Sequence, residues 1–473
     1  MKKALFLLLL LSGCAAGPDY ERPSSPISDS AFKETPQQWK EAQPSDAIAR
    51  GKWWEMFGDP ELSALVEKIE GGNFSLAASE AQYRQAQAAL GIARAGLLPS
   101  VDANASVTRS RSPSGVIGGT TAGRTVTTRS ASLSTSWEID LWGHIRRQVE
   151  AASASLEASA GDLASARLSL EAQLMTAYFQ LRSLDSQKKL FEDTVAALRT
   201  SLELTNNRYK VGVAARADVV AADAQLKSAL SQAVDLDVQR AQLEHAIAIL
   251  TGVPPSALSI KRIDNYAATV PVIPPGMPSA LLERRPDVAA AERRMAAANA
   301  QIGVAKSAFF PALTLSGQLG YRAGDPAVAL FEAPNRFWSI GPALAMNLFD
   351  FGLRRAQTDQ AIAAYDATVA NYRQTTLTAI GEVEDNLAAL RVLDEEARLQ
   401  ADSVDAARQT LELTLNQYRA GIVSYLNVVT AQANFLAEER SAANVMQRRL
   451  SAAVALVRAL GGGWDASQLS PRK

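Results

Sequence analysis

The feature that most constrains this chain is that its sequence contains one structural plan twice. The segment Ser201–Gly212 (SLELTNNRYKVG) matches Thr410–Gly421 (TLELTLNQYRAG), 209 residues further along. Earlier in each half, Leu90–Pro99 matches Ile302–Pro311 at nearly the same separation. Because this period is far longer than that of ordinary solenoid repeats, the chain is predicted to fold as two copies of one large unit.

These matches divide the chain into six segments. In order, we expect a signal peptide, a lipidated N-terminal segment, a first repeat, a proline-rich linker, a second repeat and a C-terminal tail. Their predicted bounds are 1–13, 14–61, 62–253, 254–280, 281–461 and 462–473. An extended crossing is predicted for the linker from its prolines, Pro254, Pro255, Pro271, Pro274, Pro275 and Pro278.

The longest expected elements are helices. Each repeat contains about 65 consecutive residues without proline, which predicts a helix on the order of 100 Å long at 1.5 Å per residue. Apolar residues recur every seven positions from Val149 to Leu198, and again towards Tyr418, as in coiled-coil packing. Because glycine readily adopts the left-handed conformation that ends helices, each long helix is expected to reverse at Gly212 or Gly421 into a second helix.

Between an Ala-rich helical segment and the long helix, residues of each repeat alternate between apolar and polar. We predict two strand hairpins, at residues 100–141 and 312–349, and hence four strands. The apolar positions include Ala131, Leu133, Thr135, Trp137, Ile139, Leu141, Leu313, Leu315, Leu319, Tyr321, Trp338, Ile340, Leu344, Met346 and Leu348. A membrane β-barrel shows this pattern, and so does a soluble sandwich with one wet face. The lack of further strands to cover a sandwich favours the barrel.

The amino terminus indicates the compartment. Lys2 and Lys3 precede an apolar run that is too short to span a membrane, as in a signal peptide. The run ends in Leu-Ser-Gly-Cys, which resembles the lipobox of bacterial lipoproteins, so Cys14 is predicted to carry the lipid anchor. An ordinary secretory signal with an incidental cysteine is the alternative. Ala15, the residue after the cysteine, favours the outer membrane by resemblance to lipoprotein sorting rules.

Composition excludes several classes of function. The formal net charge is -1, so no basic excess is available for nucleic acid. With one cysteine and two distant histidines, His144 and His245, the chain offers no disulfide and no Cys/His metal cluster. No apolar stretch of about 18 residues follows the signal peptide, so any membrane crossing must be made by strands.

Four strands do not close a barrel. They leave two edges whose backbone groups cannot remain unpaired in hydrocarbon, so the chain must oligomerise. Two copies would supply eight strands and three copies twelve. Because an eight-stranded barrel is filled by its own side chains while twelve strands leave a passage, a homotrimer is favoured.

A set of short motifs then resembles a known family. It comprises GPDYERP at Gly17–Pro23, WW at Trp53–Trp54, FGDPEL at Phe57–Leu62, LERRPD at Leu282–Asp287 and the paired Tyr-x-x-Gly turns. In this order they resemble the TolC-like outer-membrane efflux proteins, and among them the OprM- or NodT-type lipoproteins. The resemblance covers nearly the whole chain.

This resemblance implies a fold and a function. The fold is a trimer with a twelve-strand outer-membrane barrel, a twelve-helix periplasmic tunnel and an equatorial belt made by the termini and the linker. The function is passive export of drugs or other toxic small molecules. An inner-membrane RND-type pump supplies the energy and a periplasmic adaptor docks on the helical tips. No enzymatic activity and no cofactor besides the lipid on Cys14 are expected.

The resemblance also suggests site residues at the two helical turns. Adaptor contact is expected at Tyr209, Gly212, Val213, Tyr418, Gly421, Ile422 and Val423. The aperture is expected at Leu426, Thr430, Asp218 and Asp223, with Leu426 forming an apolar ring in the trimer. OprM-like relatives carry an acidic residue at the position of Thr430, so the two aspartates are expected to supply the charge. Glycine as a plain turn and Leu426 as a coiled-coil residue are the structural alternatives.

Three other functions compete with drug export. A lipid-anchored periplasmic coiled-coil scaffold would explain the helices and would conduct nothing. Protein or metal export could use the same fold. A lipid-anchored hydrolase would need a carboxylate pair chosen from many helix-surface Asp and Glu residues, whose ordinary role is solvation.

Overall fold

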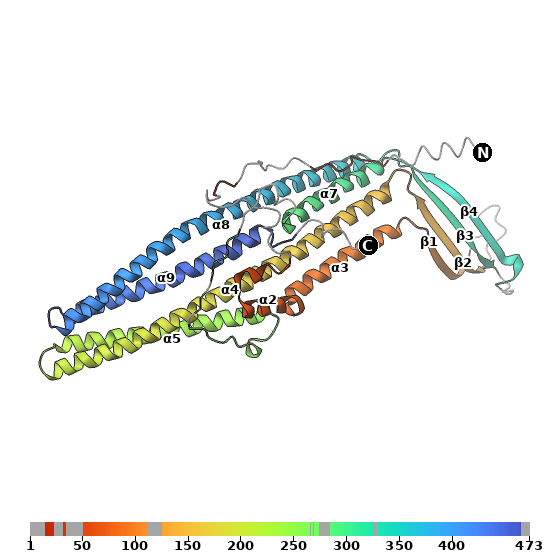
Figure 1. Ribbon diagram of the computed structural model, residues 1–473. Coiled ribbons are helices and arrows are strands. Elements are labelled where there is room, and N and C mark those ends of the chain that lie inside the picture. The colour runs from red at the N-terminus through yellow and green to blue at the C-terminus, as the bar shows by residue number, and fades with distance from the viewer. Residues whose placement is uncertain are drawn as a thin grey trace. The chain divides into compact units, whose positions relative to one another are not determined.

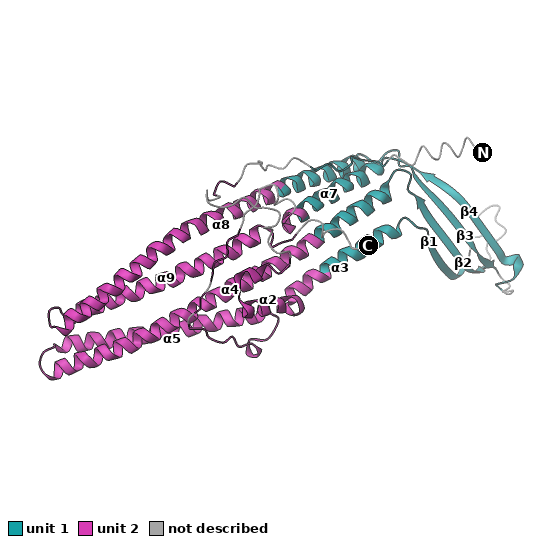
Figure 2. Ribbon diagram, viewed as in Figure 1, with its two compact units in different colours: residues 1–24, 82–159, 290–372 teal, residues 25–81, 160–289, 373–473 magenta. Residues whose placement is uncertain are grey.

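A computed structural model describes residues 15–22, 32–34, 51–111, 113, 125–264, 266–267, 269–273, 284–324 and 330–464. The chain forms two compact units (Figure 2). The sheet unit comprises residues 1–24, 82–159 and 290–372, and the helical unit comprises residues 25–81, 160–289 and 373–473. Each unit contains residues from both repeats. The repeats seen in the sequence therefore do not correspond to the two compact units.

The helices confirm the duplication. Three of them recur with identical lengths in the second repeat: 22 residues in α3 and α7, 67 in α4 and α8, and 35 in α5 and α9 (Figure 1). The bounds are α2 (Pro60–Gly72), α3 (Phe74–Ala95), α4 (His144–Lys210), α5 (Arg216–Leu250), α7 (Pro286–Ser307), α8 (Leu353–Arg419) and α9 (Tyr425–Ala459). Short 3-10 helices are η2 (Trp53–Phe57), η3 (Pro255–Ala257) and η5 (Ala333–Asn335). None of the described helices is long and apolar enough to cross a membrane.

Both long helices reverse at the predicted glycines. Gly212 and Gly421 have φ values of 79° and 78°, in the left-handed region that glycine adopts without a Cβ penalty. The next residue in each turn bonds back into the helix, from Val213 N to Arg208 O at 2.8 Å and from Ile422 N to Gln417 O at 2.9 Å. These bonds satisfy carbonyls that the helix end would leave unpaired.

The second helix of each repeat also ends in a tight backbone contact. A Cβ placed on Gly252, after α5, would lie 1.8 Å from the carbonyl oxygen of Gly72. A Cβ placed on Gly461, after α9, would lie 1.9 Å from the carbonyl oxygen of Arg284. Glycine is therefore required at both positions, and the two repeats close in the same way.

The four strands form one antiparallel sheet in the order β1-β2-β3-β4. Their bounds are β1 (Ser100–Arg111), β2 (Thr125–Ile139), β3 (Ala312–Ala323) and β4 (Arg336–Ala345). Each repeat thus contributes a hairpin, as predicted, and the β2–β3 pairing joins the two hairpins.

The predicted strands extended too far at one end. Leu141 follows β2, and Met346 and Leu348 follow β4, so none of the three belongs to a strand. Beyond each strand, an acidic side chain bonds to a backbone N–H at the start of the helix that follows. Asp140 accepts from Arg146 N at 2.9 Å, and Asp350 accepts from Gly352 N at 3.1 Å.

The register aligns the alternating residues into two different faces. Leu133 pairs with Ala103 and Leu319, and Leu319 pairs with Trp338, so one row of the sheet is apolar across all four strands. On the other face the strands carry mainly small polar side chains, including Asn104, Ser106, Ser130, Ser132, Ser134, Ser136, Ser316, Gln318 and Ser339. The alternation of apolar and polar residues predicted from the sequence therefore extends across all four strands.

The largest core belongs to the helical unit. Trp53, Trp54 and Phe57 of η2 pack with residues of α2, α4, α5, α8 and α9. The same core contains Phe32 of the N-terminal segment and Ile260 and Ile273 of the linker, so both segments pack against the helices. A buried ionic network adds to this, because Arg182 on α4 donates to Asp185 and to the carbonyl oxygen of Lys261 and also pairs with Glu61.

Candidate functional site

The two helical turns expose most of the residues predicted for adaptor contact. Val213 is 63% exposed, Ile422 73% and Tyr209 43%. Gly212 and Gly421 are also exposed, and Val423 is half-buried. Tyr418 differs from the expectation because only 5% of its surface is exposed. Its ring contributes to a contact between helices instead of an open surface.

Tyr418 lies in a cluster that joins the α4–α5 hairpin to the α8–α9 hairpin. We call Ser201, Thr205, Arg208, Tyr418 and Tyr425 the tip cluster. The Arg208 guanidinium on α4 donates to the backbone oxygen of Tyr418 on α8 at 2.6 Å and lies 4.6 Å from the centre of its ring. The Tyr418 ring contacts the ring of Tyr425 with centroids 5.4 Å apart. The contacts combine a charge-assisted hydrogen bond, a cation–π contact and an aromatic pair.

Hydroxyl groups complete the tip cluster. Ser201 donates to the Tyr425 hydroxyl at 3.1 Å, and the hydroxyls of Thr205 and Tyr418 lie 3.3 Å apart. Burial raises the pKa of Tyr425, partly offset by the Ser201 hydrogen bond, so this phenol stays neutral at physiological pH. Around it, Ala222 and Val428 are fully buried. The hairpins are therefore joined here by a small, specific contact.

The aperture residues occupy different settings. Leu426 is 66% exposed, and the Thr430 hydroxyl donates to its backbone oxygen at 3.0 Å, so the two lie one turn apart on the exposed surface of α9. The Asp218 carboxylate accepts from Ala215 N at 3.1 Å and caps α5. The Asp223 carboxylate pairs with Lys227 at 2.7 Å. Both aspartates thus have local partners, and the structure does not bring them together with Leu426 by any described contact.

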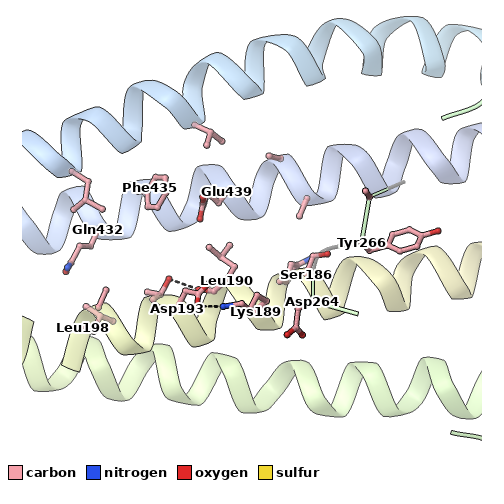
Figure 3. A pocket seen from close by; sticks show the side chains of 18 of the residues that line it. Ser186, Lys189, Leu190, Asp193, Leu198, Asp264, Tyr266, Gln432, Phe435 and Glu439 are labelled. Carbon is pink, nitrogen blue, oxygen red and sulfur yellow. Dashed lines mark hydrogen bonds and ion pairs between the residues drawn. The ribbon is translucent and has the colours of Figure 1, made fainter. Parts of the chain in front are cut away.

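A cavity of about 780 Å³ lies between the hairpins in the same unit (Figure 3). Leu190 and Leu198 line it from α4, and Phe435 and Glu439 line it from α9. Burial raises the pKa of Glu439, while Arg408 lowers it. The buried clusters that join the two hairpins beside this open cavity are small, so the hairpins are less firmly joined here than by the core around η2.

Sequence reasoning missed Ser201, Thr205, Arg208 and Tyr425. A signal was present in the repeat alignment, where Arg208 of the first copy stands opposite Gln417 of the second. The two copies of the turn are therefore chemically different: Arg208 in the first bonds to the other hairpin, whereas Arg419 in the second bonds to Asn416 on its own helix.

A second candidate site is the seat of the residues that follow Cys14, which itself lies outside the described residues. Ala16 N donates to Trp142 O at 2.8 Å, just beyond the end of β2. The Arg147 guanidinium donates to Ala16 O at 3.3 Å and to the Asp19 carboxylate at 2.8 Å. A Cβ on Gly17 would lie 2.4 Å from the Cα of Gly303, so glycine is needed for this close approach. Within the sheet unit, this segment is held where the strands meet the helices.

Comparison with known proteins agrees with this architecture. The sequence profile of the family described as outer membrane efflux protein matches residues 65–253 and 277–462, nearly the two predicted repeats. The pyoverdine export outer membrane protein OpmQ of Pseudomonas aeruginosa is 33% identical over 466 residues, 97% of this chain and 96% of the relative. The toluene efflux pump outer membrane protein TtgC of Pseudomonas putida is 32% identical over 476 residues, 98% of this chain and 96% of the relative.

Solved structures show the same fold. The outer-membrane channel OprN has a TM-score of 0.87 and 32% identity over 95% of this chain and 100% of its own. The CmeC outer membrane channel of Campylobacter jejuni has a TM-score of 0.87 and 25% identity over 96% of each chain. The chain thus belongs to the outer membrane efflux protein family. It is an outer-membrane channel component for export, which confirms the function and the location predicted from the sequence.

Proposed function

We propose that the chain acts as a homotrimer whose twelve strands close a barrel in the outer membrane. The observation that carries this proposal is the sheet, which has an apolar row across all four strands and open edges at β1 and β4. Open edges cannot remain in hydrocarbon, and three copies leave a passage lined by the polar face. The channel catalyses no reaction in this proposal.

The test is to purify the protein in detergent, measure its mass, and record single-channel currents in a planar bilayer. A trimer that conducts would support the proposal. A protein that inserts as a monomer, or a trimer that conducts nothing even after its tip contacts are removed, would overturn it in favour of a periplasmic scaffold.

The anchor is proposed to be a lipid on Cys14, the residue that precedes the seat on the sheet unit. Ala16 is bonded beside the end of β2, so an acyl chain attached two residues earlier would start near the proposed membrane boundary. Metabolic labelling with palmitate should be lost in Cys14→Ser. The trimer should still form, because the barrel anchors the protein in the membrane without the lipid. Labelling that continues in this variant would contradict the assignment.

The helical turns are proposed as the periplasmic gate and docking surface. A single uninterrupted helix, α4, leads from the end of β2 to the first turn. The exposed residues Tyr209, Gly212, Val213, Gly421 and Ile422, with half-buried Val423, would contact the adaptor of an inner-membrane RND-type pump. Tyr418 would act through the tip cluster, and Leu426 with Thr430 would narrow the aperture. Site-directed photocrosslinking from position 213 or 422 tests the contact with the adaptor. A probe that crosslinks to the lipid-facing strands and not to the adaptor would refute it.

The cargo is proposed to be small organic molecules. The relatives' names refer to pyoverdine, to toluene and, for ArpC of Pseudomonas putida, to antibiotics. Deleting the gene and complementing it should lower and restore the minimal inhibitory concentrations of such compounds. Unchanged values, together with a changed tolerance of metal ions, would favour metal export instead.

A further inference from the structure

Arginines gather at one end of the apolar face of the sheet. Arg109 and Arg111 lie on β1, Arg129 on β2 and Arg336 on β4. Each is an even number of residues from an apolar neighbour in its own strand, Val107, Ala131 or Trp338, so all four share the face that those residues occupy. We call them the arginine row. They lie towards the strand ends that are remote from α4 and α8.

The row begins where the apolar band ends. On β3, Tyr321 comes eight positions after Leu313, which is about 27 Å along the strand. At the usual strand tilt this corresponds to about 20 Å along the barrel axis. The stretch from Leu313 to Tyr321 therefore nearly spans the apolar band of a barrel, which is about 25 Å tall. Arg336 pairs with Tyr321, and Arg129 lies one step further out, level with Val107. In the proposed barrel the arginines therefore lie at the level of lipid headgroups.

Charge is segregated along the sheet. The four strands contain two acidic residues, Asp102 and Glu138, and both lie on the polar face at the opposite end. Arg109, Arg111 and Arg336 are exposed, and within the described part of the chain none of the three forms an ion pair. Among the described residues, Glu332, in the connection between β3 and β4, forms no ion pair with these three arginines.

We propose that the arginine row binds the phosphate groups of a phosphorylated glycolipid in the outer leaflet. This inference rests on the proposed barrel, which turns the apolar face towards lipid. Guanidinium groups bind phosphate oxygens in pairs of parallel hydrogen bonds, and the acyl chains of the same lipid would lie along the apolar rows below. A free anion would make no contact with those apolar rows, so the surface as a whole is suited to a lipid. In the trimer the three rows form a girdle around the outer rim.

The experiment compares two variants with equal change of charge. One replaces Arg109, Arg111, Arg129 and Arg336 with glutamine. The control replaces four other arginines with glutamine: Arg322, Arg355, Arg373 and Arg398. Of these, Arg322 lies on the polar face of the same sheet. Purified trimers are titrated with phosphorylated lipid A, with its dephosphorylated form and with inorganic phosphate, and the bound lipid is counted by native mass spectrometry.

We expect phosphorylated lipid A to bind at least about tenfold more weakly to the first variant and nearly unchanged to the control, with a steep dependence on salt. Equal binding by both variants, or equal binding of the dephosphorylated lipid to the parent, would overturn the proposal. So would inorganic phosphate that binds as tightly as the lipid.

Two further measurements keep the outcomes separate. An arginine-to-lysine version of the first variant retains charge and should recover part of the binding, which tests the row even if the glutamine variant fails to assemble. Channel currents in bilayers without lipid A should be the same for parent and variant. A parent trimer that conducts nothing even after its tip contacts are removed refutes the proposed channel, whereas intact conduction with lipid A binding unchanged in the glutamine variant refutes only the arginine row.

Discussion

Replacing Arg208 with alanine should loosen the periplasmic tip. Its guanidinium makes one charge-assisted hydrogen bond to Tyr418 O at 2.6 Å and one cation–π contact to the same ring at 4.6 Å. Arg208 is half-buried, so the hydrogen bond is worth about 1–1.5 kcal/mol after discounting for solvent, and the ring contact adds about 0.5–1 kcal/mol. Together they contribute about 2 kcal/mol.

If the hairpins must part for the channel to open, that contribution sets the size of the effect. A change of about 2 kcal/mol shifts a two-state equilibrium by about 30-fold. The resting open probability of Arg208→Ala in a planar bilayer should rise by up to that factor, and cells should become more sensitive to large antibiotics.

Two variants serve as controls for this prediction. Arg419→Ala removes an exposed arginine at the same level, whose side chain bonds Asn416 on its own helix, and should leave the open probability unchanged. Tyr418→Phe loses only the weak hydroxyl contact with Thr205 and keeps both contacts to Arg208, so its effect should be much smaller. An Arg208→Ala trimer with wild-type open probability, or an equal increase in Arg419→Ala, would refute the reasoning.

Three other predictions follow from the same structure. Leu426→Ser should raise resting conductance without changing trimer yield, and wild-type conductance in an assembled trimer would make Leu426 a packing residue. Burial raises the pKa of Glu171 to about 7, although the hydrogen bond from Trp53 lowers it. The stability that the protonated Glu171 side chain contributes is therefore fully present below about pH 4.5 and is lost as the pH rises through about 7. Glu171→Gln should therefore increase thermal stability, by on the order of 3 kcal/mol at most, at pH 8 and not at pH 4, as followed by circular dichroism; a pH-independent effect would contradict this. An epitope tag after Gly119, which lies outside the described residues between β1 and β2, should be detected on intact cells, and detection only after lysis would reverse the proposed topology.

The features that follow local patterns were predictable from the sequence. Helix ends at Gly212 and Gly421 depend on backbone conformation that only glycine adopts easily, and strand faces depend on the two-residue alternation around Leu133 and Leu319. Both signals are contained in a few neighbouring residues.

The tip cluster was not predictable in the same way. Tyr209 and Tyr418 occupy matching positions in the two repeats, but one is 43% exposed and the other 5%. Their difference arises from which helix lies opposite, and no local pattern encodes this. The buried network around Arg182 was missed for the same reason, since its partners come from α2, α4 and the linker.

The pairing of β2 with β3 has a consequence for how the protein is made. The whole of α4 and α5, 67 and 35 residues long, is synthesised between the two strands. The first hairpin therefore emerges with its apolar face and both edges uncovered, long before its partner exists. Contacts between such distant segments form slowly, and exposed edges of this kind aggregate. Secretion of this chain thus requires that the β1–β2 hairpin be shielded during its passage to the membrane, and for the edge of β2 the requirement lasts until the second repeat has been delivered.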